Sequence, residues 1–568
     1  MSMRRRDLFH AATAAGAGLA IPRWATAQSA PAAITHDGAR PQMTSGVQSG
    51  DAQADRAIVW TRADRPARLW LEWSTVASFA DAQRVRGPYL LEDSDFTGRI
   101  DLTGLPAGQE IFYRASLQDL GNERVFSQPV QGHLRLPQAG TGRATRDVRF
   151  VWSGDTAGQG FGINERWGGM KIYEQIRKLA PDFFLHSGDT IYADGPIASE
   201  VKLPDGTVWN NLVTEEVSKV AETLHEFRGR YRYNMMDANM RGMAAEVPQL
   251  WQWDDHEVMN NWSDAKSVLN DARYTEKNIP LMVARAARAF HDYAPMRRHG
   301  DEEAWRVYRH LPQGPLLDVF VLDMRSYRGP NSANLQTTED ADSAFLGRPQ
   351  VAWLVQGLKQ SKAVWKVIAA DMPVGLGVPD GKDAQGRDLW EAIANNEPNQ
   401  PLGREIEIAR LLREIKQAGI RNVVWLTADV HYTAAHFYDP ARAKFSDFAP
   451  FWEFVSGPLN AGSFGLSCPI GRVRVPRLPA PVGGRARPGG LPATPRGGGF
   501  HAVRAGTRSR HRRGWRGGGW GGTNARRAAR RACRASVRRP RRRTRSRRGP
   551  CAARRPGEIP ASSCSTAP

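Results

Sequence analysis

Hydrophobic and polar positions follow two different patterns along the chain. Between residues 44 and 140, short segments alternate apolar and polar side chains, for example at 57–60, 67–73 and 111–115, and turn residues separate them. Alternation with a period of two is typical of strands that bury one face. We therefore predict a small β-sandwich over residues 44–140, followed by a Gly/Thr/Arg-rich linker at 138–147.

From residue 148 the pattern is typical of an α/β domain. Apolar runs that end in small or acidic residues alternate with stretches of helical periodicity. The expected strands are 148–152, 182–186, 316–322, 365–370 and 422–427, and the expected helices are 167–179, 281–293 and 405–418. Such alternation predicts layered sheets covered by helices, with functional side chains at the strand ends. We assign this domain to residues 148–465.

Residues 466–568 follow neither pattern. They consist largely of Arg, Gly, Pro and Ala in no regular order, which cannot bury enough apolar surface to offset the entropy of the chain. We expect this tail to be disordered. Three interpretations are a nucleic-acid-binding arm, a linker to a further domain, and a C-terminus replaced through a frameshift in a GC-rich gene. We favour the frameshift, because the enriched residues have GC-rich codons and the change is abrupt.

The tail also accounts for the formal net charge of +21. It holds 27 arginines and one acid, so the remaining chain has 52 basic and 57 acidic residues, a balance of −5. The charge therefore gives no reason to expect specific nucleic-acid binding by the body. All four cysteines lie in the tail as well, so the body has neither a disulfide nor a thiolate ligand.

The N-terminus has the order of a secretory signal. Arg4-Arg5-Arg6 precede an apolar run that extends to Ile21, and Ala25-Thr26-Ala27 gives a cleavage site of small residues. The paired arginines predict that residues 1–27 are a twin-arginine signal, which the twin-arginine export machinery recognises. We therefore expect a periplasmic or secreted protein. The run of about twelve apolar residues is too short to span a bilayer, and no other stretch predicts a stable membrane span.

Four stretches place potential metal ligands directly after an apolar run: Ser153-Gly154-Asp155, Gly188-Asp189, Asp254-Asp255-His256-Glu257 and Asp429-Val430-His431. Each alone is explained by a turn, a helix cap or a core histidine. Together they indicate one site, because adjacent acids repel unless a cation compensates them. Carboxylates suit hard cations, and two such ions can clamp a phosphoryl group. A neighbouring histidine can protonate the leaving oxygen or stabilise developing charge.

These motifs resemble the PhoD-type alkaline phosphatases of the calcineurin-like metallophosphoesterase superfamily. The similar segments include Gly188-Asp189-Thr190-Ile191-Tyr192, residues 253–258 and Asp429-Val430-His431, together with residues 46–62 and 451–459. The resemblance covers residues 44–465. It implies a four-layer αββα metallophosphoesterase domain that hydrolyses phosphate monoesters or diesters through a metal-activated water. It also implies calcium and iron as cofactors, and manganese is compatible with the same donors.

The resemblance assigns roles to named residues. It implies metal binding by Asp155, Asp189, Tyr192, Asp255, Asp429 and His431. Asp189 would bridge the metals, Tyr192 would be a phenolate-type ligand, and Asp255 would take the place of the superfamily's asparagine. Asp255 and the adjacent His256 would be the catalytic residues, with His256 as a donor to the transition state. Asn260 or Asn261 is also expected near the site.

The chain departs from the family in two places. The family usually has a cysteine ligand in the run that here reads Ser153-Gly154-Asp155, so Asp155 is its substitute and the ligands are oxygen and nitrogen alone. The tail replaces the strands and helix that follow Gly457-Pro458 in the family. Two alternatives therefore stay open: an inactive truncated homologue, and a polyanion-binding protein that acts through the tail. The substrate is also open.

Overall fold

A computed structural model describes residues 37–463, except 141, 300–302, 304 and 399, together with the backbone of 502–505. These residues belong to one compact unit that ends at Thr507. The predicted signal at 1–27 lies outside the described residues, and so does the predicted tail apart from 502–505.

The described chain begins with a β-sandwich, as predicted. Its strands are β1 (Val47–Gln53), β2 (Arg56–Arg62), β3 (Ala67–Ser74), β4 (Gln83–Leu90), β5 (Thr97–Thr103), β6 (Glu110–Asp119) and β7 (Val130–Arg135). One sheet has the order β4-β3-β6-β7, and β1, β2 and β5 form the other layer. Along β6 every second side chain is buried, which is the alternation that predicted this strand. The alternate residues Ile111, Tyr113 and Ala115 enter the core between the layers.

One layer of the sandwich continues into the sheet of the next region. β1 pairs in parallel with β12 (Gln249–Gln252) at Gly50 and Gln249. The Gln249 amide donates a hydrogen bond of 2.9 Å to the Gln48 side chain beside this junction. The resulting eight-stranded sheet has the order β21-β8-β9-β12-β1-β2-β5, with β22 also on β8. The sequence did not predict this shared sheet.

The strands that carry the candidate residues form two sheets. Besides β12, the first contains β8 (Val148–Thr156), β9 (Phe183–Ser187) and β21 (Pro458–Asn460). The second has the order β13-β14-β15-β18-β20-β19: β13 (Arg309–Pro312), β14 (Leu317–Val321), β15 (Trp365–Ala369), β18 (Val423–Thr427), β20 (Phe451–Val455) and β19 (Ala434–Tyr438). β8, β9 and β12 are parallel, as are β14, β15, β18 and β20. Small hairpins pair β10 (Glu200–Lys202) with β11 (Val208–Asn210) and β16 (Pro379–Lys382) with β17 (Asp388–Trp390).

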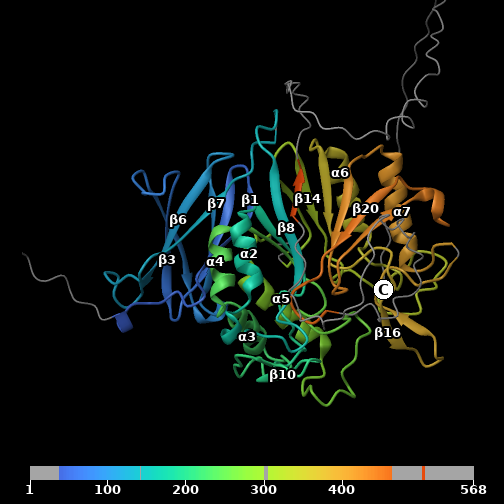
Figure 1. Cartoon of the computed structure of the whole chain (residues 1–568), viewed down its shortest axis with the longest axis horizontal. Helices are drawn as coiled ribbons and strands as arrows, with labels where there is room; N and C mark the ends of the chain where they lie inside the picture. Colours follow the sequence, from blue (N-terminus) through green and yellow to red (C-terminus); the bar gives the residue numbers. More distant parts are fainter. Residues whose placement is uncertain are drawn as a thin grey trace, which may run out of the picture. The chain divides into compact units, whose positions relative to one another are not determined.

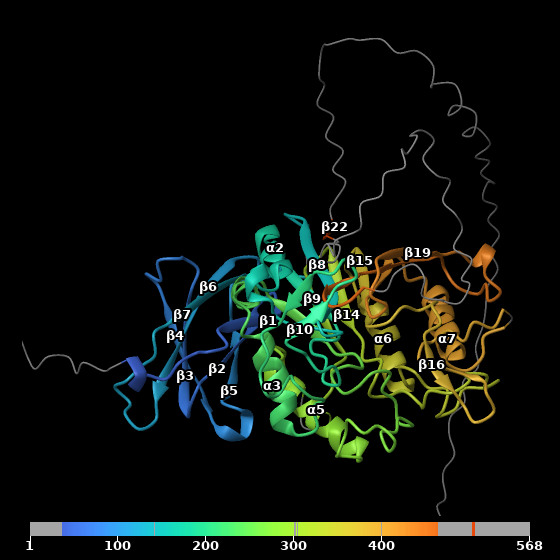
Figure 2. The ribbon, with the colours of Figure 1, turned by 60° about the horizontal axis from the view of Figure 1, so that its bottom comes forward.

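Helices cover the outer face of each sheet, which confirms the four-layer αββα architecture. The helices are α2 (Lys171–Leu179), α3 (Leu224–Asn234), α4 (Ala238–Glu246), α5 (Ile279–Tyr293), α6 (Arg348–Gln360) and α7 (Arg404–Gln417). Helices α2 to α5 share a core with β8, β9 and β12, whereas α6 and α7 share one with β14, β15 and β18. A third core fills the space between the sheets. Figures 1 and 2 show α6 and α7 on one side of the molecule and α2, α3 and α5 on the other.

Local sequence signals set where several helices begin. Thr223 and Glu226 form a reciprocal capping box at the start of α3. Asn278 caps α5 through a bond from the backbone N–H of Leu281, and Pro280 occupies its first turn, where a missing N–H costs nothing. These caps fix the starts of α3 and α5, which pack on the sheet that contains β8, β9 and β12.

One observation differs from the expectation of a disordered tail. Residues Ala502–Ala505 form strand β22, which pairs antiparallel with β8 at Val148–Val151. The edge of β8 presents backbone N–H and C=O groups that can pair with a short segment. Such pairing does not require that the segment has the alternating pattern of a strand. Within the described residues, no helix is both long and apolar enough to cross a membrane.

Candidate active site

The four predicted stretches meet where strands of both sheets end. Asp155 is the penultimate residue of β8, and Asp189 follows β9 by two residues. Asp255 follows β12, and Asp429 follows β18 in the second sheet. Parallel strands present their carboxyl ends at one edge, so residues far apart in sequence come together there. The structure thereby places all of the predicted metal-binding residues in one buried region.

The backbone at these strand ends is strained. Asp155, Asp189, Asp429 and His431 have φ angles of 67°, 52°, 64° and 55°, all in the left-handed region. Such conformations cost non-glycine residues about 1–3 kcal/mol each and cluster at functional sites. Here they turn each side chain sharply off its strand toward the shared edge.

The first cluster contains Asp155, Asp189 and His431, whose potential ligand atoms all lie within 4.8 Å of one another. His431 Nε2 is 3.4 Å from Asp155 Oδ1 and 2.9 Å from the Tyr192 hydroxyl. His431 Nδ1 bonds to the carbonyl of Gly462, just after β21. That bond leaves Nε2 facing the cluster. Tyr192 therefore lies beside this cluster.

The second cluster contains Asp189, Asp255 and His256. His256 Nδ1 lies 2.6 Å from Asp194 Oδ1, and the other Asp194 oxygen accepts a 2.9 Å bond from the backbone N–H of Asn260. Burial alone would lower the pKa of His256, but the charges of Asp194 and Asp255 outweigh it and raise the pKa to about 10. Asp194 thereby holds the His256 ring through Nδ1, which leaves Nε2 on the other side of the ring.

The third cluster contains Asp254, Asp255 and Asp429. Asp255 accepts a bond from the backbone N–H of Asn261, so this asparagine supports the site through its main chain. Burial would raise the pKa of Asp255, but the charges of His256 and Arg325 lower it to about 2. The three clusters share residues, so the acids form one continuous group.

The donors fit metal cations. Burial raises the pKa of Asp155, Asp189 and Asp429, and for Asp189 the charges of Asp255 and Asp254 add to the effect. Among the described residues, Asp155 Oδ2 and Asp255 Oδ1 are buried without a hydrogen-bond partner. Buried carboxylate oxygens need a partner, and a cation would supply one to several acids at once. The donor set of oxygen and imidazole nitrogen suits hard or intermediate metals.

Gly188 allows the end of β9 to approach the end of β12, where Asp254 lies. Its φ angle is +91°, and a Cβ atom there would lie 2.4 Å from the Asp254 Cβ. We expect Gly188→Ala to lower the free energy of unfolding by about 2–4 kcal/mol, through backbone strain together with overpacking. Gly206→Ala is the matched control, because Gly206 has a φ of +83° but no atom within 4 Å of the added Cβ. Equal losses in urea denaturation would contradict the close-approach argument.

Three comparisons with known proteins bear on this site. The chain matches the PhoD-like phosphatase family over residues 150–474 and the N-terminal domain of PhoD-like phosphatases over 26–137. It is 27% identical to alkaline phosphatase D of Bacillus subtilis (strain 168) over 444 residues, which covers 74% of this chain and 70% of that protein. A solved structure of PhoD aligns with a TM-score of 0.58 and 23% identity, covering 76% of this chain and 79% of that one.

The chain belongs to the PhoD-like phosphatase family. The predicted resemblance, the fold class and the class of enzyme, a hydrolase of phosphate esters, are thereby confirmed. The roles of the individual residues remain predictions that the geometry supports.

The structure of this PhoD-like phosphatase adds residues that sequence reasoning did not assign. Asp194 orients His256, and Glu257 accepts bonds from the backbone N–H of Thr190 (2.6 Å) and of Asp254 (2.7 Å), tying two strand ends together. Arg325 forms ion pairs with Asp254 of the third cluster and with Glu391. Asp194 lies five residues after Asp189 and two after Tyr192. This closeness to the motif is the signal in the sequence that could have pointed to Asp194.

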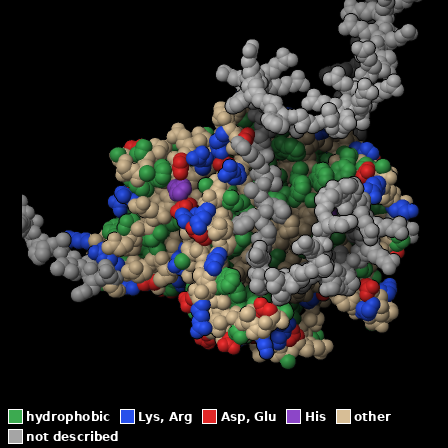
Figure 3. All heavy atoms as spheres, viewed as in Figure 1, with side chains coloured by type: hydrophobic (Ala, Val, Ile, Leu, Met, Phe, Trp, Pro, Cys, Tyr) green, Lys and Arg blue, Asp and Glu red, His purple; other side chains and the backbone are tan. Residues whose placement is uncertain are grey.

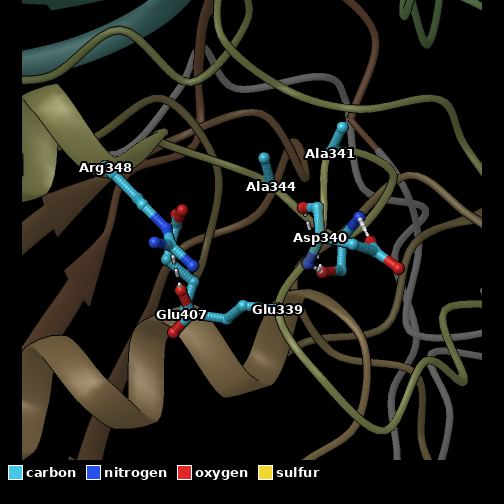
Figure 4. Close-up of a pocket in the computed structure, with 7 residues that line it drawn as sticks. Glu339, Asp340, Ala341, Ala344, Arg348 and Glu407 are labelled. Atoms are coloured by element: carbon cyan, nitrogen blue, oxygen red, sulfur yellow. Dashed lines mark hydrogen bonds and ion pairs between the residues drawn. The ribbon is translucent and has the colours of Figure 1, made fainter.

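A pocket in the second half of the chain is lined by residues other than those of this site. It has a volume of about 290 Å³ and lies between the start of α6 and α7. Figure 4 shows Arg348 and Glu407 beside Glu339 and Asp340. Glu407 accepts bonds from the backbone N–H groups of Leu346 and Gly347, which satisfies the start of α6. None of the predicted site residues lines this pocket.

Proposed function

We propose that this protein is an exported, metal-dependent hydrolase that cleaves phosphate monoesters, diesters or both by attack of water. The observation that carries the proposal is the meeting of Asp155, Asp189, Asp255, Asp429 and His431 from four strand ends, with buried oxygens left unpaired. Membership in the PhoD-like phosphatase family supports the same reaction class.

We infer calcium and iron as the metals, with manganese as a compatible substitute. The ligands would be Asp155, Asp189, Tyr192, Asp255, Asp429 and His431, with Asp189 shared between two clusters. When bound, metal ions supply Lewis acidity, which withdraws charge from phosphoryl oxygens and acidifies water. His256, held by Asp194, can donate a proton to the leaving oxygen or a hydrogen bond to the phosphoryl group.

The proposed location is the periplasm or the exterior, reached by the twin-arginine route. The order of Arg4-Arg5-Arg6, the apolar run and Ala25-Thr26-Ala27 supports it. The competing role in polyanion binding would depend on the tail. On the face drawn in Figure 3, Lys and Arg side chains of the described chain lie among Asp and Glu side chains instead of forming one basic patch.

The test is hydrolysis by the full chain after its metals are removed and restored. We expect no turnover of p-nitrophenyl phosphate or bis(p-nitrophenyl) phosphate in excess chelator, and recovery when calcium, iron or manganese is returned. Elemental analysis of the purified protein should find metal at stoichiometric amounts. A folded protein that holds no metal and cleaves neither ester under any of these conditions would instead be the inactive homologue.

A further inference from the structure

Arg325 is a fully buried cation among Asp254, Asp255, Asp371 and Glu391, and its position is fixed from two sides. Its side chain is 0% exposed. The backbone N–H of Arg325 donates a 3.0 Å bond to Asp323 Oδ1, just after β14. Asp323 also accepts bonds from the Trp253 indole (3.1 Å) and from the backbone N–H of Ser326 (2.9 Å). The turn that carries Arg325 is thereby tied to the strand end that carries Asp254 and Asp255.

The guanidinium contacts all four of these acids. Nε donates a 2.6 Å bond to Asp254 Oδ1, and Nη1 donates a 2.6 Å bond to Glu391 Oε1. Asp371 Oδ2 lies 3.8 Å from Nε, and Asp255 Oδ1 lies 3.9 Å from Nη2. These acids are at most 3% exposed, so water screens the interactions little. A planar fork with several donors is suited to such multiple contacts, whereas a lysine ammonium is a single point charge.

These contacts exclude a direct role in holding substrate. A group that binds a phosphate ester must be reached from outside, and Arg325 has no accessible surface. Its Nε and Nη1 instead donate to carboxylates that would otherwise be free to bind cations. Asp254 is the clearest case, because it belongs to a cluster with the donors of a metal site and yet bonds to Arg325.

We propose that Arg325 is a positioning residue that takes the place of a metal ion beside Asp254, Asp371 and Glu391. It keeps a metal ion away from Asp254, Asp371 and Glu391, and it holds the Asp254–Asp255 turn so that Asp255 serves the sites that contain Asp189 and Asp429. This inference rests on the proposed function, in which the site is metal-dependent. Removing the guanidinium would leave three buried carboxylates around a space that a divalent cation suits.

The experiment compares metal content among full-length variants. After equilibration with calcium and removal of free ions, we expect Arg325→Met to hold one more divalent ion per chain than the wild type. Added calcium should also raise its melting temperature by more than it does for the wild type. Arg328→Met is the matched control, because Arg328 is buried in the same turn but forms no ion pair among the described residues. Its metal content should equal that of the wild type.

Two further variants keep the inference testable if Arg325→Met does not fold. The double variant Arg325→Met, Asp254→Asn removes the charge pair together, and we expect it to lose the extra ion. Arg325→Lys should keep the wild-type metal content and KM while kcat falls about 10–100-fold, as expected for a residue that orients ligands. A raised KM with unchanged kcat would indicate substrate contact and overturn the proposal.

The outcomes separate this inference from the proposed function. A wild-type protein without metal would refute the proposed metal dependence itself. A metal-loaded wild type whose Arg325→Met variant is folded, holds no extra ion and gains no additional calcium stabilisation would refute only the role of Arg325.

Discussion

Asp189→Asn is expected to reduce kcat/KM for phosphate esters by at least about 10³-fold. Asp189 contributes to the Asp155–His431 cluster and to the Asp255–His256 cluster, so its carboxylate is the one that both would share. The amide has almost the same size but lacks the charge. Loss of metal-based charge stabilisation worth several kcal/mol corresponds to about three orders of magnitude in rate. The measurement is kcat/KM with p-nitrophenyl phosphate, accompanied by metal analysis of the same sample.

The matched control for this substitution is Asp182→Asn, at the other end of the same strand. Asp182 lies just before β9, where it accepts a 2.6 Å bond from Arg146 and a 2.8 Å bond from the backbone N–H of Arg149. It has no contact with the acids of the site, so its replacement should leave kcat/KM and metal content unchanged. If Asp189→Asn kept its metals and more than a tenth of the wild-type kcat/KM, the bridging role would be wrong.

The strand ends were predictable because the sequence marks them locally. Apolar runs stop at Gly-Asp or Asp-Asp pairs, and the structure ends β9 and β12 at or just before those pairs. Three runs have this signal and a fourth ends in Ala428-Asp429, and strand ends of an α/β domain suffice to bring Asp155, Asp189, Asp255 and Asp429 together. The prediction needed no knowledge of the distances, because the topology alone gathers the ends.

Other features depend on contacts that no local pattern records. Helix α3 was not predicted, since Arg228, Arg230 and Tyr231 are all buried in it and its apolar periodicity is hidden. The shared sheet depends on one parallel pairing of Gly50 with Gln249, about 200 residues apart in the sequence. The ion pairs of Arg325 likewise join residues that are remote in sequence. The burial of Arg325 favours ion pairing over contact with a phosphate ester.

His256 poses a different question, because a histidine beside the site can act on the leaving group or on the phosphoryl oxygens. We expect His256→Asn to lower kcat by about 10²–10⁴-fold for an alkyl phosphate ester, whose leaving oxygen must be protonated. The loss should be much smaller for p-nitrophenyl phosphate, because p-nitrophenolate leaves without a proton. Rates across a series of leaving groups measure this directly. Equal losses for all leaving groups would show that His256 stabilises phosphoryl charge instead.

Asp194 sharpens that experiment, because it contacts His256 at 2.6 Å and is itself held by the backbone N–H of Asn260. If Asp194 acts only by orienting His256 and keeping it charged, Asp194→Asn should lower kcat about 10–100-fold, and the double variant should be no slower than His256→Asn. His310→Asn is the control, since His310 faces Asp318 at 3.4 Å near the start of β14, at the opposite end of that strand from Arg325. Additive losses in the double variant would mean that Asp194 has a separate role, for which a metal ligand is the natural chemistry of a buried carboxylate at this position.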